Sequence, residues 1–177
     1  MFQAAHGSSG DGARPERLEQ LYREQLTDIC AAERQAARLF PDMAVVAADE
    51  DVASALRATG AETEVQLARV EQLIDQLEME AAGAEGASLN GFLAEARSVL
   101  AGDLPGDEDN VDGALLRSAR QALRYQIAGY ESACATARRL GDYRTLDTLL
   151  QSLDEELATD SSLSRLVARR SRMLRAL

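Results

Sequence analysis

The sequence contains no lysine, and its acidic residues outnumber the basic ones to give a net charge of −11. A chain with this charge is a poor candidate for nucleic-acid binding, because phosphate contacts need a basic face. The basic residues gather only near the C-terminus, at Arg165, Arg169, Arg170, Arg172 and Arg175. We expect these arginines to offset the dipole of a last helix or to continue as a frayed, solvated tail.

Histidine, cysteine and long apolar runs are also scarce, and each scarcity excludes a class of function. The single histidine, His6, lies in a polar leader, so no helix offers an imidazole base and we assign no catalytic residue. Cys30 and Cys134 lack metal-ligand spacing and are expected to be buried, reduced thiols. No apolar run approaches the ~18 residues of a membrane span. We therefore expect a cytoplasmic protein with neither nucleic-acid nor membrane partners.

Four long segments carry the 3.6-residue apolar period of amphipathic helices. Their stripes cover residues 15–40, 52–77, 115–140 and 146–167. Pro41 is expected to kink or end the first helix, because it removes a backbone donor. Asp49 is a natural N-cap for the second helix, and Gly141 is a natural C-cap for the third.

The lengths of the connections predict the topology. Short turns join the first helix to the second and the third to the fourth, so each pair should form an antiparallel hairpin. The middle connection exceeds thirty residues and carries its own short helix, at about 89–100. Two hairpins joined by one long crossover indicate an all-α, ferritin-like four-helix bundle. We predict a disordered leader at 1–15, the bundle at 16–170 and an Arg-rich tail at 171–177. The acidic stretch "DEDNVDG" lacks calcium-loop ligands and is expected to be a solvated linker.

Carboxylates interrupt the apolar stripes of these helices. Glu33 lies on the first stripe, Glu64 flanks the second, and Glu156 and Asp160 lie one turn apart on the fourth. Because an unpartnered buried carboxylate is costly, each needs a metal, a cation or a hydrogen-bond network. In two-metal bundles such residues project inward from all four helices. The spacing alone also allows a simpler interpretation, in which these groups only border the core.

Several runs of the sequence are more specific: "DICAAERQ", "AETEVQLARVEQL", "SLNGFLAEARSVL", "DGALLRSARQALRYQIAGY" and "LDEELATD". They resemble the YciE/YciF family of ferritin-like bacterial stress proteins, collinearly over about residues 18–166. The resemblance implies a ferritin-like bundle, commonly a homodimer, with a di-iron or di-manganese carboxylate site and a role in stress. For the dimer we expect apolar contact from the crossover, at Leu89, Phe92, Leu93 and Val99.

The match to the family's ligand residues is incomplete. Glu33 is present on the first helix, but Ala61 stands where the family tends to have a leading Glu on the second. On the third helix, Arg124 and Gln126 replace a His and a Glu of the family. The resemblance and the stripes together give a candidate metal set: Glu33, Glu64, Gln126, Glu156 and Asp160.

Two functions remain open from the sequence. The first is a non-catalytic or weakly metal-binding bundle, holding iron or manganese below stoichiometry or not at all, and kept for dimerisation and partner contacts. The second is a di-iron or di-manganese oxidoreductase acting on ferrous ion or peroxide through an altered ligand set. Arg124 bears on this choice. If it turned inward, it would pair with Glu33 or Glu156 and replace the metal electrostatically, whereas outward it is a surface residue.

Overall fold

The computed structural model describes residues 13–79, 94–103 and 108–174, and these are almost wholly helical, with no strand among them. The helices are α1 (Ala13–Val46), α2 (Glu50–Gln76), α4 (Ala94–Leu100), α5 (Glu108–Leu140) and α6 (Tyr143–Leu174). The predicted all-α class is therefore confirmed. None of the described helices is long and apolar enough to cross a membrane.

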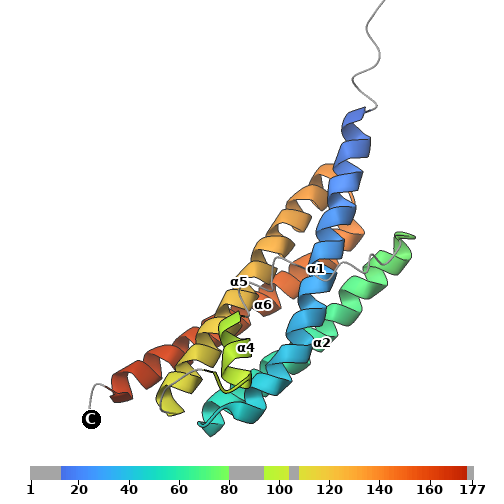
Figure 1. Ribbon diagram of the computed structural model, residues 1–177. Helices are drawn as coiled ribbons and strands as arrows, with labels where there is room; N and C mark the ends of the chain where they lie inside the picture. The colour runs from blue at the N-terminus through green and yellow to red at the C-terminus, as the bar shows by residue number, and fades with distance from the viewer. Residues whose placement is uncertain (1–12, 80–93, 104–107, 175–177) are drawn as a thin grey trace, which may run out of the picture.

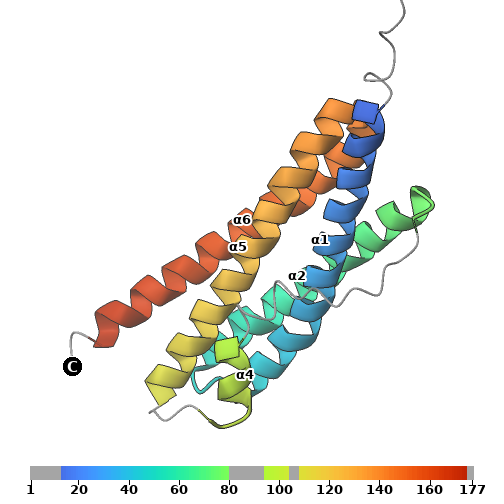
Figure 2. The same cartoon turned by 45° about the horizontal axis from the view of Figure 1, so that its top comes forward.

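The helices form two antiparallel hairpins that pack against each other as a bundle, as predicted (Figure 1). One hairpin is α1–α2 and the other is α5–α6; α1 lies against α5, and α2 contacts α6. The short helix α4 belongs to the crossover and packs on α5 and α1. It covers the second half of the predicted helix at 89–100, and residues 89–93 lie outside the described chain. Figure 2 shows that α6 diverges from α5 toward its C-terminal end.

The helix ends follow local rules that were visible in the sequence. Asp49 adopts an extended backbone and accepts hydrogen bonds from the N–H groups of Asp51 and Val52, so it is the N-cap of α2. Gly141 has a φ of 74°, and the N–H of Asp142 bonds to the carbonyl of Ala137, as in a C-terminal Schellman motif. Both capping predictions are confirmed.

Pro41 does not end α1, which continues through it to Val46. The proline ring lies against Gly60 of α2, where a Cβ would come within 3.3 Å of the Pro41 Cδ atom. A glycine at this crossing therefore leaves room for the ring. The lost backbone donor is tolerated because packing against α2 supplies most of the stability of such a helix.

A polar layer divides the core of the bundle into two apolar clusters. One cluster lies toward α4 and includes Phe40, Leu56 and Leu115. The other lies toward the α5–α6 turn and includes Leu26 and Leu149, together with the two cysteines, which are buried and free as predicted. Between the clusters, the inward positions of all four long helices are polar. The apolar stripes of the four long helices are thus interrupted by polar residues at the same level of the bundle.

Residues 108–113 of the stretch predicted to be a solvated linker instead belong to α5, and Asp112 is among the most buried of the described residues. Its carboxylate accepts the N–H groups of Ala48 and Asp49 at 2.9 and 3.1 Å. Arg170 Nη2 lies 2.9 Å from the same carboxylate and also pairs with Asp49, while Arg169 pairs with Asp51. Arg169 and Arg170 thus fasten α6 to the α1–α2 turn and do not belong to a frayed end. We call Asp49, Asp112 and Arg170 the end junction.

Candidate functional site

The polar layer takes side chains from all four long helices, and none of these residues is more than 2% exposed. Its members are Glu33 of α1, Thr59, Thr63 and Gln66 of α2, Gln126 and Tyr130 of α5, and Ser152 and Glu156 of α6. Polar groups this deep need partners, because each unpaired group costs about 1–3 kcal/mol. The partners present decide what the layer can do.

Both carboxylate oxygens of Glu33 accept a hydrogen bond within the layer. Gln126 Nε2 donates to Oε2 at 2.7 Å, and the Tyr130 hydroxyl donates to Oε1 at 2.8 Å. Burial raises the pKa of Glu33 above its ordinary value, and the two hydrogen bonds oppose part of that rise. Burial and the nearby Glu33 carboxylate also raise the pKa of Tyr130, so its hydroxyl stays a donor.

Glu156, unlike Glu33, lacks hydrogen-bond donors in the described part of the chain. Neither of its carboxylate oxygens has a hydrogen-bond partner among the described residues. Burial raises its pKa most, and the charges of Glu33, Glu62 and Glu155 raise it further. Every charge that acts on it from the described part of the chain raises its pKa, so its neutral form is favoured near neutral pH. An unpartnered, buried acid is also what a ligand or proton-carrying group looks like in a protein interior.

The predicted carboxylate of α2 is not in the layer. Glu64 is exposed, and so are Ala61 and Glu62, while Thr63 and Gln66 point inward. A carboxylate at Ala61 would therefore lie outside the core. Glu62 accepts a hydrogen bond from the Thr159 hydroxyl at 2.6 Å and is the α2 carboxylate whose charge acts on Glu156. Thr63 continues the 3.6-residue period of Leu56 and Gly60, so its inward position was visible in the sequence.

Asp160 is engaged by arginine at the edge of the bundle. Arg120 Nε and Nη2 donate to its two oxygens at 2.7 and 3.2 Å. Arg124 Nε is 4.0 Å from Asp160, and its side chain is 63% exposed. Arg124 therefore faces outward, and the alternative in which it pairs with Glu33 or Glu156 does not occur. Sequence analysis missed Arg120, which a one-turn spacing from Arg124 could have suggested.

Three of the five candidate residues thus come together: Glu33, Gln126 and Glu156. Two-metal bundles use a Glu from each of two helices and a Glu-x-x-His pair from each of the other two. Here the single positions hold Glu33 and Gln126, and the paired positions hold Thr63 with Gln66 and Glu156 with Thr159. Among the described residues, no three His, Cys, Asp or Glu side chains lie close enough to hold a metal ion. This donor set does not fit a two-metal centre.

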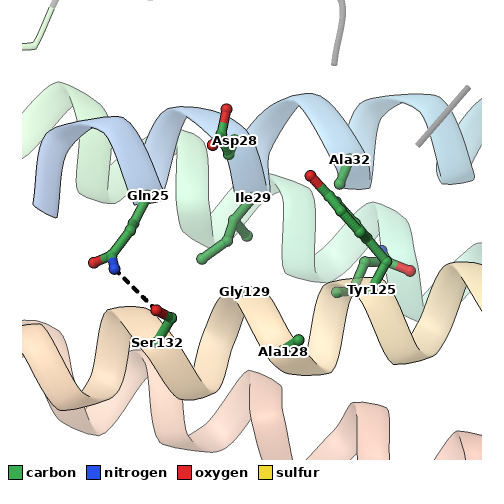
Figure 3. Close-up of a pocket in the computed structure, with 9 residues that line it drawn as sticks. Gln25, Asp28, Ile29, Ala32, Tyr125, Ala128, Gly129 and Ser132 are labelled. Atoms are coloured by element: carbon green, nitrogen blue, oxygen red, sulfur yellow. Dashed lines mark hydrogen bonds between the residues drawn. The ribbon is translucent and has the colours of Figure 1, made fainter. Parts of the chain in front are cut away.

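A cavity of about 270 Å³ between α1 and α5 leads from the surface toward the layer. Gln126 lies in its wall, with Ile29 and Gly129 on facing helices (Figure 3). A Cβ at position 129 would come within 3.1 Å of Ile29, so the glycine lets α1 and α5 approach closely here. At the other end, Gln25 donates to the Ser132 hydroxyl at 3.0 Å across the cavity.

A family model described as a domain of unknown function, DUF892, matches residues 17–173. The chain belongs to this family. The protein YciF of Escherichia coli (strain K12) is 27% identical over 149 residues, which cover 83% of this chain and 88% of the relative. The sequence resemblance to this group is therefore confirmed.

Two solved structures share the fold along most of their length. The crystal structure of the E. coli stress protein YciF superimposes with a TM-score of 0.81 at 26% identity, over 88% of this chain and 97% of that one. YcfI from Rhodopseudomonas palustris, described as a candidate structural protein, gives a TM-score of 0.76 at 29% identity. That match covers 83% of this chain and 92% of YcfI.

Proposed function

We propose that this chain is a structural bundle protein of a stress-associated family, without two-metal redox chemistry. The observation that carries the proposal is the donor set of the polar layer, whose described residues include two carboxylates, Glu33 and Glu156. One of them is already saturated by Gln126 and Tyr130. The similarity to a relative described as a candidate structural protein supports the same role.

The chemical reason lies in what iron and manganese require. Hard divalent cations are held by several oxygen ligands, most of them anionic, and a pair of ions needs carboxylates that bridge them. Gln126, Thr63 and Gln66 provide neutral oxygens at the positions where anionic or imidazole ligands would be needed. Two ions would then bring four positive charges to a layer with at most two negative ones. Their desolvation would not be compensated.

Metal content is the decisive measurement. The purified full-length chain should be loaded aerobically with ferrous ion, and separately with manganese, then desalted and analysed for metal. We expect clearly fewer than two ions per chain and little ferroxidase activity. Because the surface is acidic, a Glu33→Gln, Glu156→Gln double variant gives the background of non-specific binding. Two tightly held ions per chain, lost in that variant, would overturn the proposal and favour a di-metal oxidoreductase.

A second function, weak binding of a single ion, is favoured by Glu156. Its two oxygens and the Oε1 of Gln126 have no hydrogen-bond partner among the described residues. They offer one carboxylate and one carbonyl to a cation, with Glu33 beside them. This set supports at most a weak site, and substoichiometric metal in the loading experiment would reveal it.

We also propose that the protein is a homodimer in the cytoplasm, as expected from the family resemblance. Three of the four crossover residues expected at the interface, Leu89, Phe92 and Leu93, lie outside the described chain. Val99 packs into the apolar cluster near α4, so it supports the bundle itself and is not free for a partner. Light scattering at high micromolar concentration tests the dimer, and a monomer throughout would contradict it.

A further inference from the structure

Gln126 does something at the centre of the bundle that a carboxylate in its place could not do. Its amide nitrogen donates a hydrogen bond to Glu33 Oε2 at 2.7 Å, with both side chains removed from solvent. An ionised glutamate has only acceptors, so at this position it would repel Glu33 instead of donating to it. The amide therefore satisfies one buried acid without adding another.

We propose that Gln126 keeps the centre of this bundle independent of metal, and that a carboxylate at position 126 would make the same fold depend on a divalent cation. The inference rests on the proposed function and deepens it, because it assigns the loss of the metal centre to one residue. Gln126 and Tyr130 supply to Glu33 the two contacts that cations would otherwise make.

The unpartnered atoms of the layer support this role. Gln126 Oε1 and both oxygens of Glu156 are buried acceptors without donors among the described residues. With glutamate at 126, three carboxyl groups from α1, α5 and α6 would meet, and the Tyr130 hydroxyl would be the remaining donor to Glu33. Three buried acids in one layer are strongly unfavourable unless they bind protons or a cation. Three carboxylates are also a reasonable ligand set for one hard divalent ion.

A route for the cation exists on the same side of the layer. Gln126 lines the cavity between α1 and α5, and none of the described residues that line it is basic. An ion can therefore approach position 126 without crossing the apolar clusters. The cavity is about 270 Å³, which is ample for a hydrated ion.

The test compares the wild-type chain with two matched variants. Gln126→Glu carries three buried carboxyl groups, whereas Glu33→Gln with Gln126→Glu exchanges the pair and keeps two carboxyls with one amide donor. Thermal unfolding is followed by circular dichroism at neutral pH, in EDTA and in MnCl₂, and bound manganese is measured by equilibrium dialysis. We expect manganese to stabilise only Gln126→Glu. Its midpoint of thermal unfolding should rise by about 5–10 °C when the manganese concentration is about 100-fold above the dissociation constant. Gln25→Glu, on the cavity rim outside the layer, should not respond.

The outcomes separate the inference from the proposed function. A wild-type chain that manganese stabilises as much as Gln126→Glu would overturn both. A wild-type chain that does not respond, beside a Gln126→Glu variant that binds no manganese, would overturn the inference alone. If Gln126→Glu fails to fold in EDTA, recovery on refolding with manganese supports the inference, and failure to recover contradicts it. A manganese response in the exchanged pair equal to that of Gln126→Glu would show that the amide donor is not the deciding feature.

Discussion

The bundle buries acidic residues in two places, and the two places treat them in opposite ways. In the end junction, Asp112 accepts two backbone N–H groups and the guanidinium of Arg170. In the polar layer, Glu33 accepts hydrogen bonds from the amide of Gln126 and the hydroxyl of Tyr130. Glu156 accepts no hydrogen bond from the described residues. Asp112 and Glu156 are equally removed from solvent, at 1% exposure each. Burial alone therefore does not distinguish them; the donors do.

The difference separates two kinds of buried carboxylate: one whose charge is compensated by donors, and one whose charge is not. A buried carboxylate that is paired, hydrogen-bonded and capping a turn holds elements together, and its charge is compensated. A buried carboxylate without donors destabilises the protein in its ionised form, so its retention needs a different explanation. Glu156 is of this second kind, because neither of its carboxylate oxygens has a donor among the described residues.

The comparison predicts first that the end junction contributes most to stability. Asp112→Ala removes the acceptor of two N–H groups and leaves Arg170 without its most buried partner. We expect the free energy of unfolding to fall by about 3–5 kcal/mol, because two backbone N–H groups lose their acceptor and Arg170 loses its most buried carboxylate partner. Urea unfolding followed by circular dichroism measures the change.

Asp51→Ala is the matched control for that experiment. Its pair with Arg169 joins α6 to the start of α2, next to the end junction, but the side chains of Asp51 and Arg169 are 65% and 52% exposed. Exposed pairs contribute about 0–1 kcal/mol. Equal losses in Asp112→Ala and Asp51→Ala would mean that burial of the junction carries no energetic weight.

The second prediction concerns pH and comes from the polar layer. The pKa values of Glu33 and Glu156 are raised from 4.5 to about 8 and about 9, chiefly by burial. At pH values between the unfolded pKa of 4.5 and these raised values, the folded chain binds more protons than the unfolded chain. Stability therefore falls as pH rises through this range. We expect the free energy of unfolding to decrease between pH 5 and pH 9, by up to about 1.4 kcal/mol per pH unit for each proton taken up. A rise of stability over this range in urea titrations would contradict it.

The sequence was sufficient to predict the architecture, because the stripes and the caps are local. A 3.6-residue period needs no knowledge of the partner helix, and Asp49 and Gly141 act on their own backbone. The same period placed Glu33, Gln126 and Glu156 on the apolar stripes, and the structure buries all three. Periodicity is less useful on α2, where one residue of register rotates a side chain by about 100°. That error separates the exposed Glu64 from the buried Thr63.

The end junction could not be predicted in this way. "DEDNVDG" has the composition of a solvated loop. Asp112 becomes buried only because Arg170, far along the chain, and the backbone of the α1–α2 turn converge on it. A contact of that kind is tertiary. The arginine-rich end was misjudged for the same reason, because its partners lie on other helices.

The third prediction is a substitution that should stabilise the protein. Glu156→Gln removes an unpartnered buried acid while keeping its shape, so at pH 8 we expect the free energy of unfolding to rise by about 1–2 kcal/mol. The fall of stability with pH should also become shallower. Glu33→Gln is the contrast: its new amide would face the donors Gln126 and Tyr130, so it should gain less or lose stability. A stabilisation of equal size in both variants would show that the donors around Glu33 do not matter.

The smallest effect is expected at Arg124, the residue that could have replaced a metal ion electrostatically. Its guanidinium is 4.0 Å from Asp160 and largely exposed, so it contributes little to the field inside the layer. Arg124→Ala should change the free energy of unfolding by about 0.5 kcal/mol or less. Arg120→Ala is the matched comparison, because Arg120 makes a bidentate contact with Asp160. This substitution should lower the free energy of unfolding by about 1–2 kcal/mol. If Arg124→Ala instead steepened the loss of stability between pH 5 and pH 9, Arg124 would be acting on Glu33 or Glu156. The polar layer would then hold a compensating charge after all, and its contrast with the end junction would disappear.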